Sequence, residues 1–105
     1  MNRKTAKTVK VLLEVAYDKM KYAVSLCGGS INDGKRQAFD EICHEADCFM
    51  VEALDYMRKD NAVGAENKLY VRYQELIALR LKIWEYWQML WREQQEISTL
   101  LATMA

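Results

Sequence analysis

Residues that break helices are almost absent from this chain, and this feature limits its fold more than any other. The 105 residues include no proline and only four glycines. An all-β chain needs turn residues about every 8–12 positions, so the composition argues against one. Three of the glycines lie within segment 28–34, and the fourth is Gly64. Because Gly and Asn tolerate positive φ, segments 28–34 and 60–64 are the predicted turns.

The remaining chain is expected to form three helices, at about residues 4–27, 33–60 and 65–103. Asn32 or Asp33 is the expected N-cap of the second helix. Loops this short place consecutive helices antiparallel. We therefore predict an all-α fold, an elongated antiparallel three-helix bundle in a single domain spanning residues 1–105. The C-terminal helix is overlong, because it exceeds its neighbours by about 11–15 residues, or roughly 16–22 Å.

Apolar residues recur at alternating steps of three and four, which places them on one side of each helix. In the first helix these residues are Val9, Leu13, Ala16, Met20, Ala23 and Cys27. In the second they are Phe39, Ile42, Ala46, Phe49, Ala53 and Tyr56. The third helix has an apolar heptad seam that is widened at position e, which is typical of a multi-helix core. The residues at position e are Tyr70, Ile77, Trp84 and Trp91. Its polar a positions, Arg80 and Gln94, can fix register and oligomeric state.

The C-terminal part of the third helix is the expected contact surface. A helix end that exposes an apolar face to water is an aggregation liability, so we expect a second subunit or a larger protein to cover it. A dimer is the simplest closed arrangement, with a four-helix-bundle-like assembly as a variant. Tryptophan is enriched at interface hot spots, although aromatic residues at helical spacing are also typical of a core. The candidate partner-binding residues are Trp84, Trp87, Trp91, Ile97, Leu100, Leu101 and Met104.

The two signs of charge are unevenly distributed, although 15 basic residues balance 15 acidic ones overall. Residues 1–28 hold six basic and two acidic side chains, whereas residues 29–62 hold four and eight. One interpretation is that the first two helices pair through opposite charge within one bundle. The alternative is a face that binds nucleic acid through phosphate contacts. Its candidate residues are Arg3, Lys4, Lys7 and Lys10.

Glu41 and His44 have the spacing by which ferritin-like four-helix proteins place a carboxylate and an imidazole on one di-iron centre. Glu14 or Asp18 is the candidate facing carboxylate. The motif has to occur twice, or once in each half of a symmetric dimer. Here His44 is the only histidine, and it lies opposite the predicted core row. A ferritin-like metal-binding half-bundle is therefore a remote alternative to a solvated polar face.

Three cysteines, Cys27, Cys43 and Cys48, indicate free thiols in a reducing compartment, because their number is odd. His44 and Cys48 are four residues apart and can face one metal ion, whereas Cys43 and Cys48 cannot. A structural zinc takes four ligands, and this segment supplies two, or three with Cys27. We therefore expect the cysteines to be small apolar core residues, with no metal and no cofactor.

No arrangement of residues points to catalysis. His44 is the only base near a thiol and has no third group to orient it. Gly28-Gly29-Ser30 lacks the ending of a phosphate-binding loop. No apolar run approaches the ~20 residues of a membrane-spanning helix. The stretch after the basic N-terminus is too interrupted by charge for a secretory signal. The expected function is a non-enzymatic assembly or adaptor protein in the cytoplasm. The alternative is a nucleic-acid-associated accessory or regulatory protein.

Overall fold

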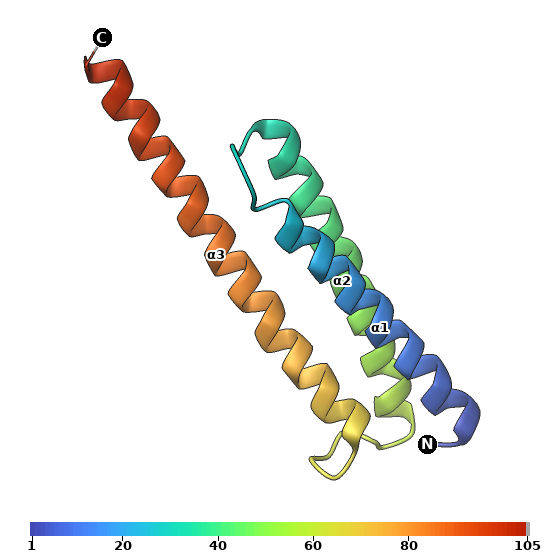
Figure 1. Ribbon diagram of the computed structural model, residues 1–105. Coiled ribbons are helices and arrows are strands. Elements are labelled where there is room, and N and C mark those ends of the chain that lie inside the picture. Colours follow the sequence, from blue (N-terminus) through green and yellow to red (C-terminus); the bar gives the residue numbers. More distant parts are fainter. Residues whose placement is uncertain (105) are drawn as a thin grey trace.

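The computed structural model describes residues 1–104, which form three helices and contain no strand. These are α1 (Arg3–Ser25), α2 (Asp33–Lys59) and α3 (Lys68–Met104). In Figure 1 α1 rises from the N-terminus, α2 descends and α3 rises again beside them. The molecule measures 65 × 22 × 17 Å along its principal axes. The all-helical class predicted from the scarcity of glycine and proline is confirmed, and the helices pack as a bundle.

An asparagine caps the start of each helix. The side-chain oxygen of Asn2 accepts a hydrogen bond from the backbone N–H of Thr5 at 2.8 Å, and Asn32 accepts one from Lys35 at the same distance. Asn67 accepts the N–H of Leu69 at 2.9 Å. Such caps satisfy N–H groups that have no partner within the helix. Because Asn67 supplies the cap, the third helix begins three residues later than predicted, at Lys68.

Small side chains bring α1 and α2 together. Ala16 and Ala23 on α1, and Ala46 and Ala53 on α2, are fully buried. The distance between packed helices depends on the side chains at the contact, so four alanines allow a close approach. The predicted row on α1 is confirmed as core except for Cys27, which is only partly buried.

The predicted core row on α2 is partly wrong. Its central positions are held by Cys43, Met50 and Met57 rather than by Ile42, Phe49 and Tyr56. Ile42 and Phe49 are partly buried at the edge of the core, and Tyr56 is exposed. The two rows are adjacent on the helix and both are apolar. Helical spacing alone therefore does not decide which of them faces the centre of the bundle.

α3 joins the core through a short set of buried side chains, namely Leu76, Ile83 and Trp87. The Trp87 ring stacks on Phe39 of α2 with centroids 4.2 Å apart and an interplanar angle of 8°. Aromatic pairs of this kind add to the stabilisation that comes from burial alone. The Phe39–Trp87 stack is therefore a main anchor of α3 on the α1–α2 pair.

Both polar a positions of α3 bind groups within the same chain. Arg80 forms a two-pronged ion pair with Asp47 of α2, with Nε to Oδ1 at 2.9 Å and Nη2 to Oδ2 at 3.2 Å. The side-chain oxygen of Gln94 accepts the N–H of Ile31 at 2.7 Å, and its amide nitrogen donates to the Ile31 carbonyl. Ile31 lies in the buried part of the α1–α2 connection, where its backbone groups need partners. These contacts set the register of α3 against α1 and α2.

Candidate functional site

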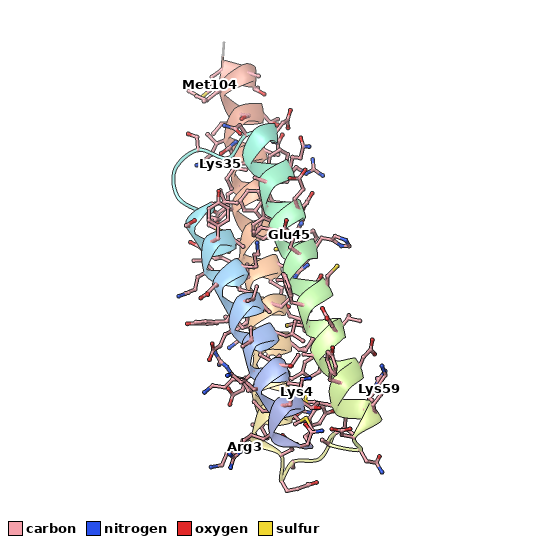
Figure 2. All side chains as sticks on the ribbon, turned by 90° about the vertical axis from the view of Figure 1, so that its right-hand side faces the viewer. Arg3, Lys4, Lys35, Glu45, Lys59 and Met104 are labelled. Carbon is pink, nitrogen blue, oxygen red and sulfur yellow. The ribbon has the colours of Figure 1, made fainter. Side chains whose placement is uncertain are left out.

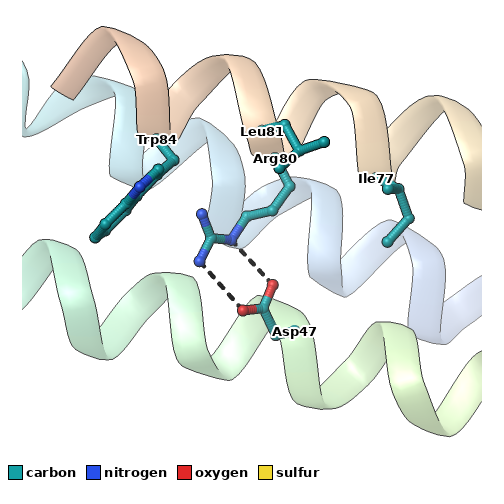
Figure 3. A pocket seen from close by; sticks show the side chains of 5 residues that line it. All are labelled: Asp47, Ile77, Arg80, Leu81 and Trp84. Atoms are coloured by element: carbon teal, nitrogen blue, oxygen red, sulfur yellow. Dashed lines mark hydrogen bonds and ion pairs between the residues drawn. The ribbon is translucent and has the colours of Figure 1, made fainter. Parts of the chain in front are cut away.

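A groove between α2 and α3 exposes apolar side chains around the Arg80–Asp47 ion pair. Its lining residues are Asp47, Ile77, Arg80, Leu81 and Trp84. Figure 3 shows the guanidinium and the carboxylate facing each other between the two helices, with Trp84 and Ile77 on either side along α3. Leu81 is 57% exposed and Trp84 is 38% exposed. The groove is therefore an apolar surface with a neutralised charge pair in its floor.

The ion pair positions the tryptophan at the edge of this groove. The Arg80 guanidinium carbon lies 5.7 Å from the centroid of the Trp84 ring, within the range of a cation–π interaction. The same guanidinium is bound to Asp47 on its other side. Arg80 therefore fixes the position of the Trp84 ring relative to α2. The heptad pattern identified Ile77 and Trp84 but missed Leu81, which the spacing 77, 81, 84 along one face would have revealed.

The last ten described residues of α3 form a second apolar surface, which we call the C-terminal extension (residues 95–104). Gln94 is the last partly buried residue, and every residue after it is exposed. Figure 1 shows this end of α3 continuing past the ends of α1 and α2. At a rise of about 1.5 Å per residue the extension is about 15 Å long. Its large apolar side chains, between 59% and 74% exposed, are Ile97, Leu100, Leu101 and Met104.

The three tryptophans proposed for partner binding occupy three different environments. Trp87 is 2% exposed and belongs to the core, so its assignment to a contact surface was wrong. Trp91 is partly buried, and the Arg36 guanidinium carbon lies 5.0 Å from its ring centroid. Trp84 remains accessible at the groove between α2 and α3. The surface available to a partner therefore contains Trp84, part of Trp91 and the extension.

The basic residues proposed for nucleic acid gather at the opposite end of the bundle. Arg3, Lys4, Lys7 and Lys10 are all exposed. Figure 2 shows Arg3 and Lys4 at the same end as Lys59, far from Met104. Among residues 1–104 the one ion pair that joins α1 to α2 is Lys19–Glu45 at 3.1 Å. The predicted pairing of α1 with α2 through opposite charges is therefore limited to that pair, and the basic end remains free.

The candidate metal ligands lie mainly on the outer side of α2. His44 is exposed as expected, and Glu41 is exposed beside it. Glu14 lines a hollow between α1 and α3, and Asp18 is exposed on α1. Within residues 1–104 no group of three or more His, Cys, Asp or Glu side chains is arranged to hold a metal ion. This chain by itself does not assemble the four-carboxylate interior of a ferritin-like centre.

The three thiols are free but differ in exposure. Cys43 is buried, Cys27 is partly buried and Cys48 is exposed, so the expectation that all three are core residues was wrong for Cys48. Burial raises the pKa of the Cys43 thiol to about 11, with Arg80 opposing the rise and Asp47 adding to it. Burial also raises the pKa of Cys27. Because the thiolate is the reactive form, Cys43 is the least reactive of the three.

Alkylation by iodoacetamide at pH 8 should modify Cys48 at least tenfold faster than Cys43. Cys43 is 3% exposed and its raised pKa leaves little thiolate at this pH, whereas Cys48 is open to reagent. Both cysteines lie in the tryptic peptide 37–58, so tandem mass spectrometry that fragments this peptide, sampled over time, measures the two rates. In denaturant the difference should disappear. Equal rates in the folded protein would contradict the burial of Cys43.

The raised pKa of Cys43 also predicts that the protein becomes less stable at high pH. The folded protein holds the Cys43 proton more tightly than the unfolded chain does. Its contribution is therefore complete below the ordinary thiol pKa of 9.0 and is lost as pH rises towards about 11. Urea unfolding at pH 8 and pH 10.5 measures this loss. In Cys43→Ala the loss should be smaller than in the unaltered protein.

Comparison with known proteins gives no relative. No family model matches the chain, and neither a curated protein nor a solved structure matches it. Within the described residues, none of the three helices has a stretch apolar and long enough to cross a lipid bilayer.

Proposed function

We propose that this chain is a non-enzymatic assembly or adaptor protein that associates through the C-terminal extension of α3. The supporting observation is the exposure of Ile97, Leu100, Leu101 and Met104 beyond the end of the bundle. Full burial of such a side chain is worth about 1.5–3 kcal/mol. Covering all four is therefore comparable with much of the ~5–15 kcal/mol stability of a small domain. The helix is unbroken to Met104, so it does not fold back to cover its own face.

A second copy of the chain is the partner that fits this surface most simply. We consider two extensions that run antiparallel, with their apolar faces together and a two-fold axis that crosses them at the level of residue 99. This arrangement brings Ile97 of each copy against Leu101 of the other. The extension is about 15 Å long, so each C-terminal end reaches the other bundle at the level of Gln94. This arrangement covers both apolar faces over their full length. An oligomer of the three-helix bundle is also what the sequence favours.

The test of this proposal is the molar mass in solution of the unaltered protein and of Ile97→Lys/Leu101→Lys. The unaltered chain should be a dimer by light scattering at micromolar concentration. The double variant should be a folded monomer, because a lysine pair cannot be buried against itself. Gln95→Lys/Thr99→Lys is the matched control, since it adds the same charges with the same spacing on the opposite side of α3. The control should remain a dimer.

Two results would contradict self-association through the extension. One is an unaltered protein that remains a monomer at high micromolar concentration. The other is a double variant that keeps the dimer while the control loses it. The first result would favour a larger protein as the partner of the same surface, as in an adaptor. Circular dichroism at 222 nm should show the same helix content in all three proteins.

The second candidate function is that of a nucleic-acid-associated accessory protein. It is supported by the exposure of Arg3, Lys4, Lys7 and Lys10 at one end of the bundle, close to Lys59. Phosphate contacts depend steeply on salt. An electrophoretic shift with duplex DNA or RNA at 50 mM salt should therefore disappear at 300 mM, and Lys4→Glu/Lys7→Glu should abolish it. No shift at low salt would exclude this role. For either function we propose a reducing cytoplasm, in which the three thiols stay free.

A further inference from the structure

His44 and Cys48 lie one turn apart on the outer side of α2, with their ligand atoms already at chelating distance. The Cys48 sulfur is 3.7 Å from Nε2 of His44, and both side chains are exposed. Zinc binds sulfur at about 2.3 Å and imidazole nitrogen at about 2.0–2.1 Å in a tetrahedral site, so two such ligands lie about 3.6 Å apart. A zinc ion can therefore bridge this pair with little movement of either side chain.

Among residues 1–104, no other thiol and no carboxylate completes the site within one chain. Cys43 is buried on another side of α2. Asp47 lies in the same hollow, but both of its oxygens are bound by Arg80. No third ligand joins the pair within residues 1–104. One chain therefore offers half of the four ligands that a structural zinc takes.

We propose that His44 and Cys48 form half of a zinc site that the same two residues of a second copy complete. A two-fold axis through this face of α2 places identical side chains opposite each other, which gives two imidazole nitrogens and two thiolates. Each Cys48 thiol releases its proton to solvent when its sulfur binds zinc. Two thiolates and one zinc dication then carry no net charge. The contact also covers Val51, which is exposed in the same hollow.

The surrounding carboxylates make this contact dependent on the metal. Besides Asp47, whose charge Arg80 neutralises, Glu52 and Asp55 line the hollow around the His44–Cys48 pair. Two copies that meet at this face bring like charges together, which opposes association. Without metal the two faces therefore stay apart, and with zinc the four metal–ligand bonds overcome the repulsion. This contact is on α2, so it is independent of the C-terminal extension and of the function proposed for it.

Titration with Co²⁺ in the presence of a thiol-free reductant tests the site directly. The tetrahedral ligand-field bands and the thiolate-to-cobalt charge-transfer band should rise together and reach an end point at one metal ion per two chains. Zn²⁺ should displace Co²⁺ and abolish both bands. Cys48→Ser and His44→Gln should each weaken binding at least a hundredfold. Cys27→Ser is the matched control and should leave the titration unchanged.

Light scattering of Ile97→Lys/Leu101→Lys, with and without Zn²⁺, measures the association separately from the extension. Zinc at one ion per two chains should double the molar mass, and a chelator should reverse the change. An end point at one ion per chain without doubling would overturn the proposal. Binding that survives in His44→Gln would also overturn it. So would a doubling that resists chelator but is reversed by reductant, because it would identify a Cys48 disulfide.

Discussion

Replacing Trp87 by alanine should lower the free energy of unfolding by about 3–5 kcal/mol. The Trp87 ring is almost completely buried and stacks on Phe39 at 4.2 Å, so its removal leaves a large cavity beneath α3. Only Leu76 and Ile83 of α3 share this degree of burial. The variant should therefore lose much of the attachment of α3 to the α1–α2 pair. Urea denaturation followed by circular dichroism measures the change.

Tyr86→Ala is the matched control for this substitution. Tyr86 precedes Trp87 on the same helix but is exposed, so its loss should change stability by no more than about 0.5 kcal/mol. Hydrogen exchange should also show that amides of α3 open more readily in Trp87→Ala than amides of α2. A cost for Trp87→Ala no larger than that for Tyr86→Ala would contradict the anchoring role of the Phe39–Trp87 stack.

Enlarging Ala46 to leucine should destabilise the protein by about 1–3 kcal/mol. Ala46 is fully buried, as are the other alanines that pack α1 against α2. A longer side chain has no space there unless the two helices separate. The same substitution at Ala78, an exposed alanine on α3, is the control and should have almost no effect. Thermal or urea unfolding compares the two variants. An Ala46→Leu protein as stable as the original would mean that the α1–α2 contact is loosely packed.

The positions of the helices and turns were largely predictable because local chemistry determines them. Gly29 and Asn61 both adopt positive φ, of 71° and 57°, in the two segments that their residue types predicted as turns. Asn32 caps α2 through its own side chain, as its position suggested. These effects act over three or four residues, so they are visible in the sequence alone. The start of α3 was misplaced because Ala65 and Glu66 favour a helix, whereas the cap at Asn67 begins the helix after them.

Which apolar residues face the core was less predictable, because that depends on contacts between distant segments. The rows containing Ile42 and Cys43 on α2 are equally apolar, and only the placement of α1 and α3 decides between them. Trp84, Trp87 and Trp91 illustrate the same limit at the candidate site. All three lie close together on α3, yet the ring centroid of Trp87 lies 4.2 Å from that of Phe39, whereas the centroid of Trp84 is 6.1 Å from it and Trp84 stays exposed. Arg80 was identified as a polar core position, but its partner Asp47 is 33 residues away and no local pattern links them.

The attachment of Gln94 to Ile31 has a mechanical consequence. It joins α3 to the α1–α2 connection at the last point before the helix leaves the bundle. No glycine or proline follows in the sequence, so the extension has no hinge. It therefore acts as a stiff arm whose direction is set by the bundle. A molecule bound at the tip is held at a defined distance and orientation, and a pull on that molecule is transmitted to the bundle first at Ile31.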